Sequence, residues 1–140
     1  MAHPLLDAVL TEAIDLAQHL LSKNGEFFPF GIRAIESGEL IHVHGYTGEE
    51  QPPSNDIIDL LKSAFLKEAG AGEIVAAAIC YDVTLRSSDT NEPSTDAVCT
   101  HLEHVEGECF VVYLPYTNEG DNVFTYGEVF AEEGERCFFK

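Results

Sequence analysis

Positions 109–116 read CFVVYLPY, eight residues without a charge. Successive side chains of a β-strand point to opposite faces, so Phe110 and Val112 face one way and Val111 and Tyr113 the other. A strand that is apolar on both faces is typical of the centre of a sheet that is covered on both sides. Either the helices divide between the two faces, or a second copy of the chain covers one of them. The second alternative predicts a homodimer with a mainly hydrophobic interface.

Alternating apolar and polar residues predict further strands around this one. The expected strands of this half of the chain are 74–86, 97–105, 108–116 and 123–131. Glu106 and Gly107 suggest a two-residue hairpin turn, which places 97–105 directly beside the central strand. The cross-strand pairs expected from this turn are Leu102 with Val111, His104 with Cys109, and His101 with Val112.

The first half of the chain predicts two helices and a hairpin. The expected elements are a helix over 4–24, strands over 27–35 and 40–46, and a helix over 54–69. Pro4 suits the first turn of a helix, and Asn24 with Gly25 stops it. The predicted fold is a single α+β domain over residues 1–140, with two helices packed on a mostly antiparallel six-stranded sheet in the element order αββαββββ.

The chain has many more acidic than basic residues. The formal net charge is -18 in 140 residues, although 45% of the residues are hydrophobic. Between Ser87 and Glu135 there are twelve carboxylates and neither a lysine nor an arginine. Such a surface repels nucleic-acid phosphates and anionic lipids, so we expect neither as a partner. It favours a basic protein, for which Glu132, Glu133 and Glu135 are the candidate binding residues.

The cysteines predict buried free thiols rather than a disulfide framework. Cys80, Cys99, Cys109 and Cys137 are far apart in the sequence and form no C-x-x-C motif. The N-terminal residues lack the basic region and apolar run of a signal peptide, and no stretch reaches the roughly 18 apolar residues of a membrane-spanning helix. These features predict a cytoplasmic protein.

Two histidines suggest an alternative, a small metal-dependent or ligand-binding enzyme. His42 and His44 are two residues apart in a predicted strand, so both rings lie on the same face. Some zinc enzymes use this spacing together with a third ligand from a neighbouring strand. His101, Cys99 or a carboxylate could supply that ligand, and the cofactor would then be zinc. If the two imidazoles are instead ordinary surface groups, no cofactor is expected.

Other chemistry has little support in the sequence. None of the motifs G-x-S-x-G, H-E-x-x-H and G-x-G-x-x-G occurs. Arg33 and Arg86 lie in predicted strands, where a salt bridge with one of the many acidic residues is the expected role. The sequence therefore names no catalytic residue.

Several short segments carry a resemblance to known proteins. These segments are Phe28-Pro29-Phe30-Gly31, Tyr81-Asp82-Val83, Leu102-Glu103-His104 and Val112-Tyr113-Leu114-Pro115-Tyr116. With them the chain resembles small bacterial proteins of unassigned function over most of its length. By element order it is also similar to the profilin-like layout of roadblock and longin domains, which act by dimerisation and protein binding.

The resemblance implies strands and turns and supplies no catalytic residue. Together with the charge, it predicts a non-catalytic acidic protein-interaction module that is homodimeric and works in the bacterial cytoplasm. Neutralising a basic toxin or holding a secretion client would fit this charge.

Overall fold

The computed structural model describes residues 4–44, 54–85 and 95–139 and has an α+β fold of two helices and seven strands. The elements in chain order are α1 (Pro4–Asn24), β1 (Phe30–Ala34), β2 (Leu40–His44), α2 (Ser54–Gly70), β3 (Ala76–Leu85), β4 (Thr95–His104), β5 (Cys109–Asn118), β6 (Phe124–Tyr126) and β7 (Phe130–Glu133). The α+β class and the mostly antiparallel sheet predicted from the sequence are confirmed.

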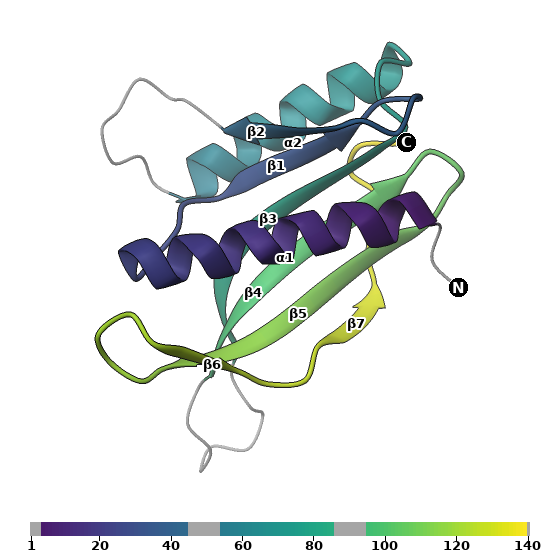
Figure 1. Cartoon of the computed structure of the whole chain (residues 1–140). Helices are drawn as coiled ribbons and strands as arrows, with labels where there is room; N and C mark the ends of the chain where they lie inside the picture. Colours follow the sequence, from purple (N-terminus) through teal and green to yellow (C-terminus); the bar gives the residue numbers. More distant parts are fainter. Residues whose placement is uncertain (1–3, 45–53, 86–94, 140) are drawn as a thin grey trace.

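The strands form one sheet in the order β2-β1-β3-β4-β5-β6, and β7 also pairs with β5 (Figure 1). Every described strand pair is antiparallel. As predicted, β5 is an internal strand with β4 on one side. Its other side is occupied by β6 and β7, which makes these two short strands one edge of the sheet, while β2 forms the other.

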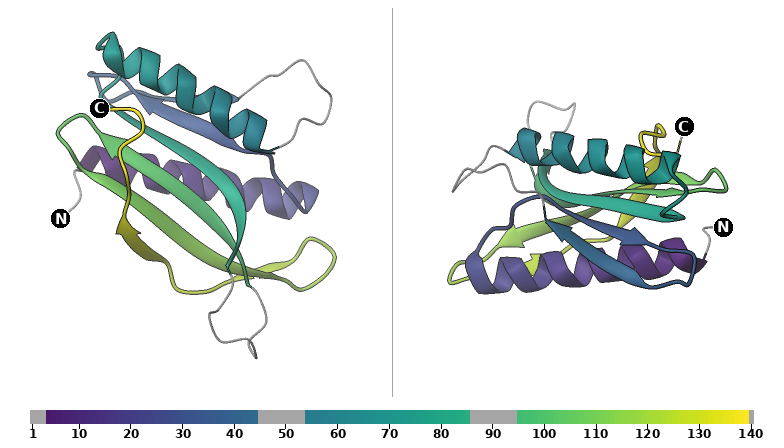
Figure 2. Two further views of the ribbon diagram at one scale, coloured as in Figure 1. Left: turned by 180° about the vertical axis from the view of Figure 1, so that it is seen from behind. Right: turned by 90° about the horizontal axis from the view of Figure 1, so that it is seen from above.

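The helices lie on opposite faces of the sheet (Figure 2). Helix α1 packs on β4, β3 and β1 from one side, and α2 packs on β1 and β3 from the other. The residues that α1 buries are Leu6, Val9, Ala13, Ala17 and Leu21, and those that α2 buries are Ile57, Leu61 and Phe65. The helices therefore divide between the two faces of the sheet, which is the first of the two alternatives considered for the apolar segment CFVVYLPY. On the α2 side, however, α2 packs on β1 and β3 and leaves Val111 and Tyr113 of β5 half-buried, so the homodimer stays a prediction.

The register between β4 and β5 differs from the expected one by one residue. Leu102 lies opposite Phe110 and Glu103 lies opposite Cys109. The loop has three residues, not two, because the His104 N–H donates to the Glu108 carbonyl (2.9 Å) and the Gly107 N–H to the His104 carbonyl (3.0 Å). Gly107 has φ 117°, which glycine adopts readily in such a bulged three-residue turn.

The edge expected as one strand over 123–131 is two strands, which corrects the predicted six strands to seven and the order to αββαβββββ. Tyr126 lies opposite Tyr116, and Phe130 lies opposite Tyr113. The three edge residues 127–129 therefore lie opposite only two residues of β5, 114 and 115. The break falls at Pro115. Its carbonyl accepts a hydrogen bond from the Gly127 N–H (2.8 Å), but proline has no N–H to return one.

Candidate functional site

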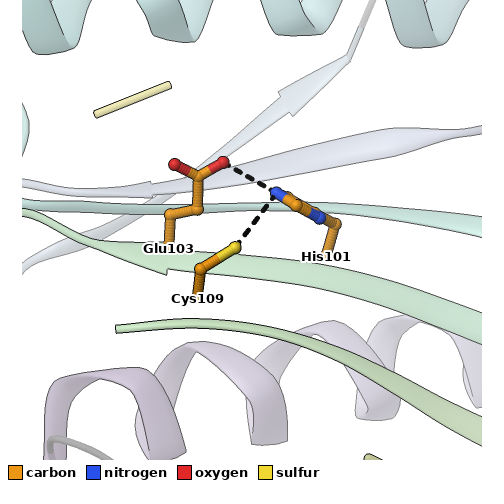
Figure 3. Close-up of side chains that lie close together, drawn as sticks. All are labelled: His101, Glu103 and Cys109. Atoms are coloured by element: carbon orange, nitrogen blue, oxygen red, sulfur yellow. Dashed lines mark hydrogen bonds and ion pairs between the residues drawn. The ribbon is translucent and has the colours of Figure 1, made fainter. Parts of the chain in front are cut away.

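The densest group of chemically active side chains lies on the α2 side of β4 and β5. Figure 3 shows His101, Glu103 and Cys109 projecting from the sheet toward one another. The His101 Nε2 is 2.7 Å from a Glu103 carboxylate oxygen and 3.8 Å from the Cys109 Sγ. Among the described residues, these three form the group whose possible metal-ligand atoms all lie within 4.8 Å of one another.

Glu103 has no exposed surface and binds the end of the chain. Its carboxylate accepts hydrogen bonds from the backbone N–H groups of Cys137 (2.7 Å), Phe138 (3.1 Å) and Phe139 (3.2 Å). Phe138 is buried against Phe65 of α2, with ring centroids 5.4 Å apart, and against the His101 ring at 5.3 Å. A buried carboxylate thus holds the C-terminal segment across the α2 face of the sheet.

The hydrogen bonds decide the charge of this carboxylate. Burial alone would raise the pKa of Glu103, but the bonds from His101 and the three backbone N–H groups outweigh burial and lower that pKa. Burial, followed by the nearby Glu103 charge, raises the pKa of Cys109 to about 11. Cys109 is therefore a protonated thiol near neutral pH, whereas nucleophilic cysteines depend on a lowered pKa.

The same geometry disfavours a metal centre or a catalytic triad at this group. The thiol and the carboxylate both approach Nε2 of His101, so the ring cannot pass a proton from one nitrogen to the other between them. Both oxygens of Glu103 already face N–H donors, whose positive ends repel a cation. We interpret the group as a structural anchor.

The pair His42 and His44 lies on the α1 side of the edge strand β2. The His42 Nε2 is 2.8 Å from a Glu12 carboxylate oxygen on α1, and both side chains are partly exposed. Strands β1 and β3 separate β2 from β4, the strand that carries His101 and Cys99. The structure therefore brings neither His101 nor Cys99 next to the histidine pair, whereas a carboxylate, the third kind of ligand considered, does lie beside His42 in the form of Glu12.

The other expectations on charged and thiol groups have clear outcomes. All four cysteines are free, as predicted, and Cys80, Cys99 and Cys109 are buried, whereas Cys137 is only half-buried. The predicted salt bridge of Arg33 is confirmed, with 2.8 Å between its guanidinium and Glu68 of α2. Arg86 lies outside the described residues. Within the described ranges, no helix is long and apolar enough to cross a bilayer.

Glu132 and Glu133 lie in β7, all four residues of which are exposed, and Glu135 follows shortly after. The Tyr113 hydroxyl donates a hydrogen bond to the Glu132 carboxylate (3.1 Å), and the Phe130 ring stacks on Tyr113 with centroids 5.1 Å apart. Burial raises the pKa of Tyr113 to about 12, so this phenol keeps its proton and remains a donor. The edge therefore combines carboxylates with exposed apolar surface.

A cavity of about 310 Å³ adjoins this edge on the α1 side of the sheet. Its lining residues are Leu6, Asp7, Leu10, Leu102, Phe110, Val112 and Ala131. Asp7 is the charged residue among them. The cavity lies between the first turns of α1 and strands β4, β5 and β7, where the small side chain of Ala131 leaves room at the edge.

Sequence reasoning missed both the anchor and the cavity. The predicted two-residue turn placed His104, not Glu103, opposite Cys109. With that register the group around Glu103 could not be predicted. Gly107 at the third position of the loop was the available signal, because glycine there is typical of a bulged three-residue turn. Comparison of the chain with family models, with curated proteins and with solved structures found no match.

Proposed function

We propose that this protein is a non-catalytic acidic interaction module that binds a basic protein through β7 and the residues that follow it. The observation that carries the proposal is the state of β7: it is exposed along its whole length and carries Glu132 and Glu133. These carboxylates belong to the long segment without lysine or arginine. A negative field of this kind steers and selects a positively charged partner.

The chemistry of the best-defined polar group favours this proposal over an enzyme. The Cys109 thiol is protonated, and the Glu103 carboxylate is saturated by donors from the chain itself. Exposed carboxylates beside the stacked Tyr113 and Phe130 rings provide the mixture of apolar contact and charge on which protein interfaces depend.

The test removes three charges at the edge without removing side-chain bulk. Glu132→Gln, Glu133→Gln and Glu135→Gln are combined, and basic proteins captured from a lysate by the purified variant are compared with those captured by the native protein. The matched control combines Glu26→Gln, Glu36→Gln and Glu39→Gln, three exposed residues outside β7 and its following segment. Both variants lose the same formal charge, so they differ only in where the charge was.

We expect the β7 variant to lose captured basic proteins that the control retains. Equal capture by both variants would mean that total charge, not this edge, attracts them, and would contradict the proposal. Stoichiometric zinc in the purified protein that disappears when His42 and His44 are changed to alanine would favour the metal-dependent enzyme instead.

A further inference from the structure

Resting on the interaction function proposed above, we propose how the basic partner binds. An extended basic segment adds to the open edge of β7 as a further antiparallel or parallel strand, and it places one apolar side chain in the cavity between α1 and β5. The inference thus specifies the chemistry of the partner: a lysine- or arginine-rich strand with a single apolar anchor.

The backbone of β7 has groups available for such a strand. The Gly134 N–H donates to the Cys109 carbonyl (3.1 Å), so position 134 turns its backbone groups toward β5. Backbone groups alternate in direction along a strand, so those of Ala131 and Glu133 point away from β5. In the described part of the chain, β7 pairs with β5 and with no other strand. Its outer edge is therefore a template for main-chain hydrogen bonds.

The cavity lies on the face that an added strand would reach. Ala131 lies opposite Val112, and both line the cavity. A residue of the added strand that pairs with Ala131 directs its side chain to this same face. A cavity of about 310 Å³ is at the lower end of the roughly 300–1,000 Å³ typical of ligand pockets, which suits one apolar side chain better than a larger ligand.

Charge decides between a basic partner and a second copy of this chain. Asp7 lines the cavity, and Glu133, two residues after Ala131, lies on the same face of β7, whereas Glu132 lies on the opposite face. Pairing two β7 edges would bring the carboxylates of both copies close together, in molecules that each carry a formal charge of -18. A segment rich in lysine or arginine would neutralise the same groups.

The experiment uses the full-length protein and three synthetic peptides in a calorimetric titration. The first peptide alternates lysine and threonine around one central leucine. In the second the leucine is alanine, and in the third alternate backbone nitrogens are methylated, which keeps the charge and removes the N–H groups of one edge. We expect both changes to weaken binding by about 10-fold or more, because each removes an interaction that strand addition needs.

Two substitutions in the protein test the same two contacts. Ala131→Leu fills the cavity at an exposed position, so the leucine and alanine peptides should then bind alike. Glu133→Pro removes an outward N–H that β5 does not use, so it should weaken binding by about 10-fold relative to Glu133→Gln, which removes the same charge. Circular dichroism and the melting temperature verify that both variants remain folded.

The outcomes separate this inference from the function on which it rests. Binding could be weakened in the Glu132, Glu133 and Glu135 variant and yet be unchanged by backbone methylation and by Ala131→Leu. That result would support the interaction function and overturn strand addition. Absence of binding by the leucine peptide at about 1 mM, a weak affinity for any specific contact, would also overturn the inference. So would self-association of the protein that Glu133→Pro abolishes, because the occupant would then be a second copy.

Discussion

Glu103 shows at the scale of one residue how a carboxylate can be fully buried in a protein with few cations. Four hydrogen-bond donors replace its water: the His101 ring and the N–H groups of Cys137, Phe138 and Phe139. Bonds to a charged group are stronger than those between neutral groups, so they offset the cost of burial. The residue therefore stabilises the fold through the segment that it holds.

We expect Glu103→Gln to lower the free energy of unfolding by about 2–4 kcal/mol at pH 7, because an amide loses the charge and turns an N–H group toward other donors. Denaturant unfolding measures this change, and hydrogen exchange at residues 137–139 should speed up with it. Glu106→Gln, in the exposed hairpin loop, is the matched control and should change stability by less than about 0.5 kcal/mol.

The same residue gives a dependence on pH with a definite sign. The pKa of Glu103 is lower in the folded protein than in the unfolded chain, so protonation favours unfolding. The contribution of Glu103 to the free energy of unfolding is complete above the ordinary glutamate pKa of about 4.3. It is lost as the pH falls through the lower pKa that Glu103 has in the folded protein. Native protein should therefore lose more stability in acid than Glu103→Gln does. An equal loss of stability in acid for the native protein and for Glu103→Gln would contradict the role of Glu103 as a charged anchor.

At the scale of the elements, the close approach of α2 to β1 depends on Gly31. A Cβ atom at this position would lie 2.5 Å from the Cζ of Phe65, a distance that forces one of them to move. Phe65 is fully buried and packs against Phe138, so its ring has little room to shift. The absence of a side chain at Gly31 lets the helix lie directly on the strand.

We therefore expect Gly31→Ala to lower the free energy of unfolding by about 1–3 kcal/mol, as overpacking of a core does. Gly70→Ala is the control, because a Cβ there meets no heavy atom within 4 Å and the residue is helical. This control should raise stability by up to about 1 kcal/mol. Thermal unfolding of both variants measures the difference, and a neutral Gly31→Ala would mean that α2 lies farther from β1.

At the scale of the whole molecule, the formal charge of -18 opposes folding and attracts basic partners. Raising the ionic strength from about 0.01 M to 0.15 M shortens the screening length from roughly 30 Å to 8 Å. The free energy of unfolding should rise over this range, because repulsion among the carboxylates weakens, while binding to a basic peptide should weaken. Denaturation and titration in the same buffers measure both, and responses of equal sign would contradict the charge argument.

Sedimentation in these two buffers also addresses the predicted homodimer. A helix lies on each face of the sheet, but α2 packs on β1 and β3 and leaves Val111 and Tyr113 of β5 half-buried, so the apolar character of β5 still fits a second subunit on that face. A dimer, if it forms, should be stronger at the higher ionic strength, because two subunits of the same charge repel each other less there.

Local patterns in the sequence determined the elements and the charge. The helices end where the spacing of three and four residues ends, and the strands follow alternation, because both patterns depend on neighbours within a few positions. The alternation in CFVVYLPY predicted an internal strand, and β5 is paired on both sides. The run of carboxylates without a cation predicted which partners the surface repels.

Only the tertiary structure decided the register, the anchor and the cavity. One residue more in the loop at Gly107 shifts the pairing of β4 with β5 by one position, and that shift puts Cys109 beside Glu103. The anchor then needs the backbone of Phe138, 35 residues away in the chain, and the cavity needs α1 and β7. These contacts join distant residues, so no spacing along the chain encodes them; packing of the two helices on the twisted sheet sets them.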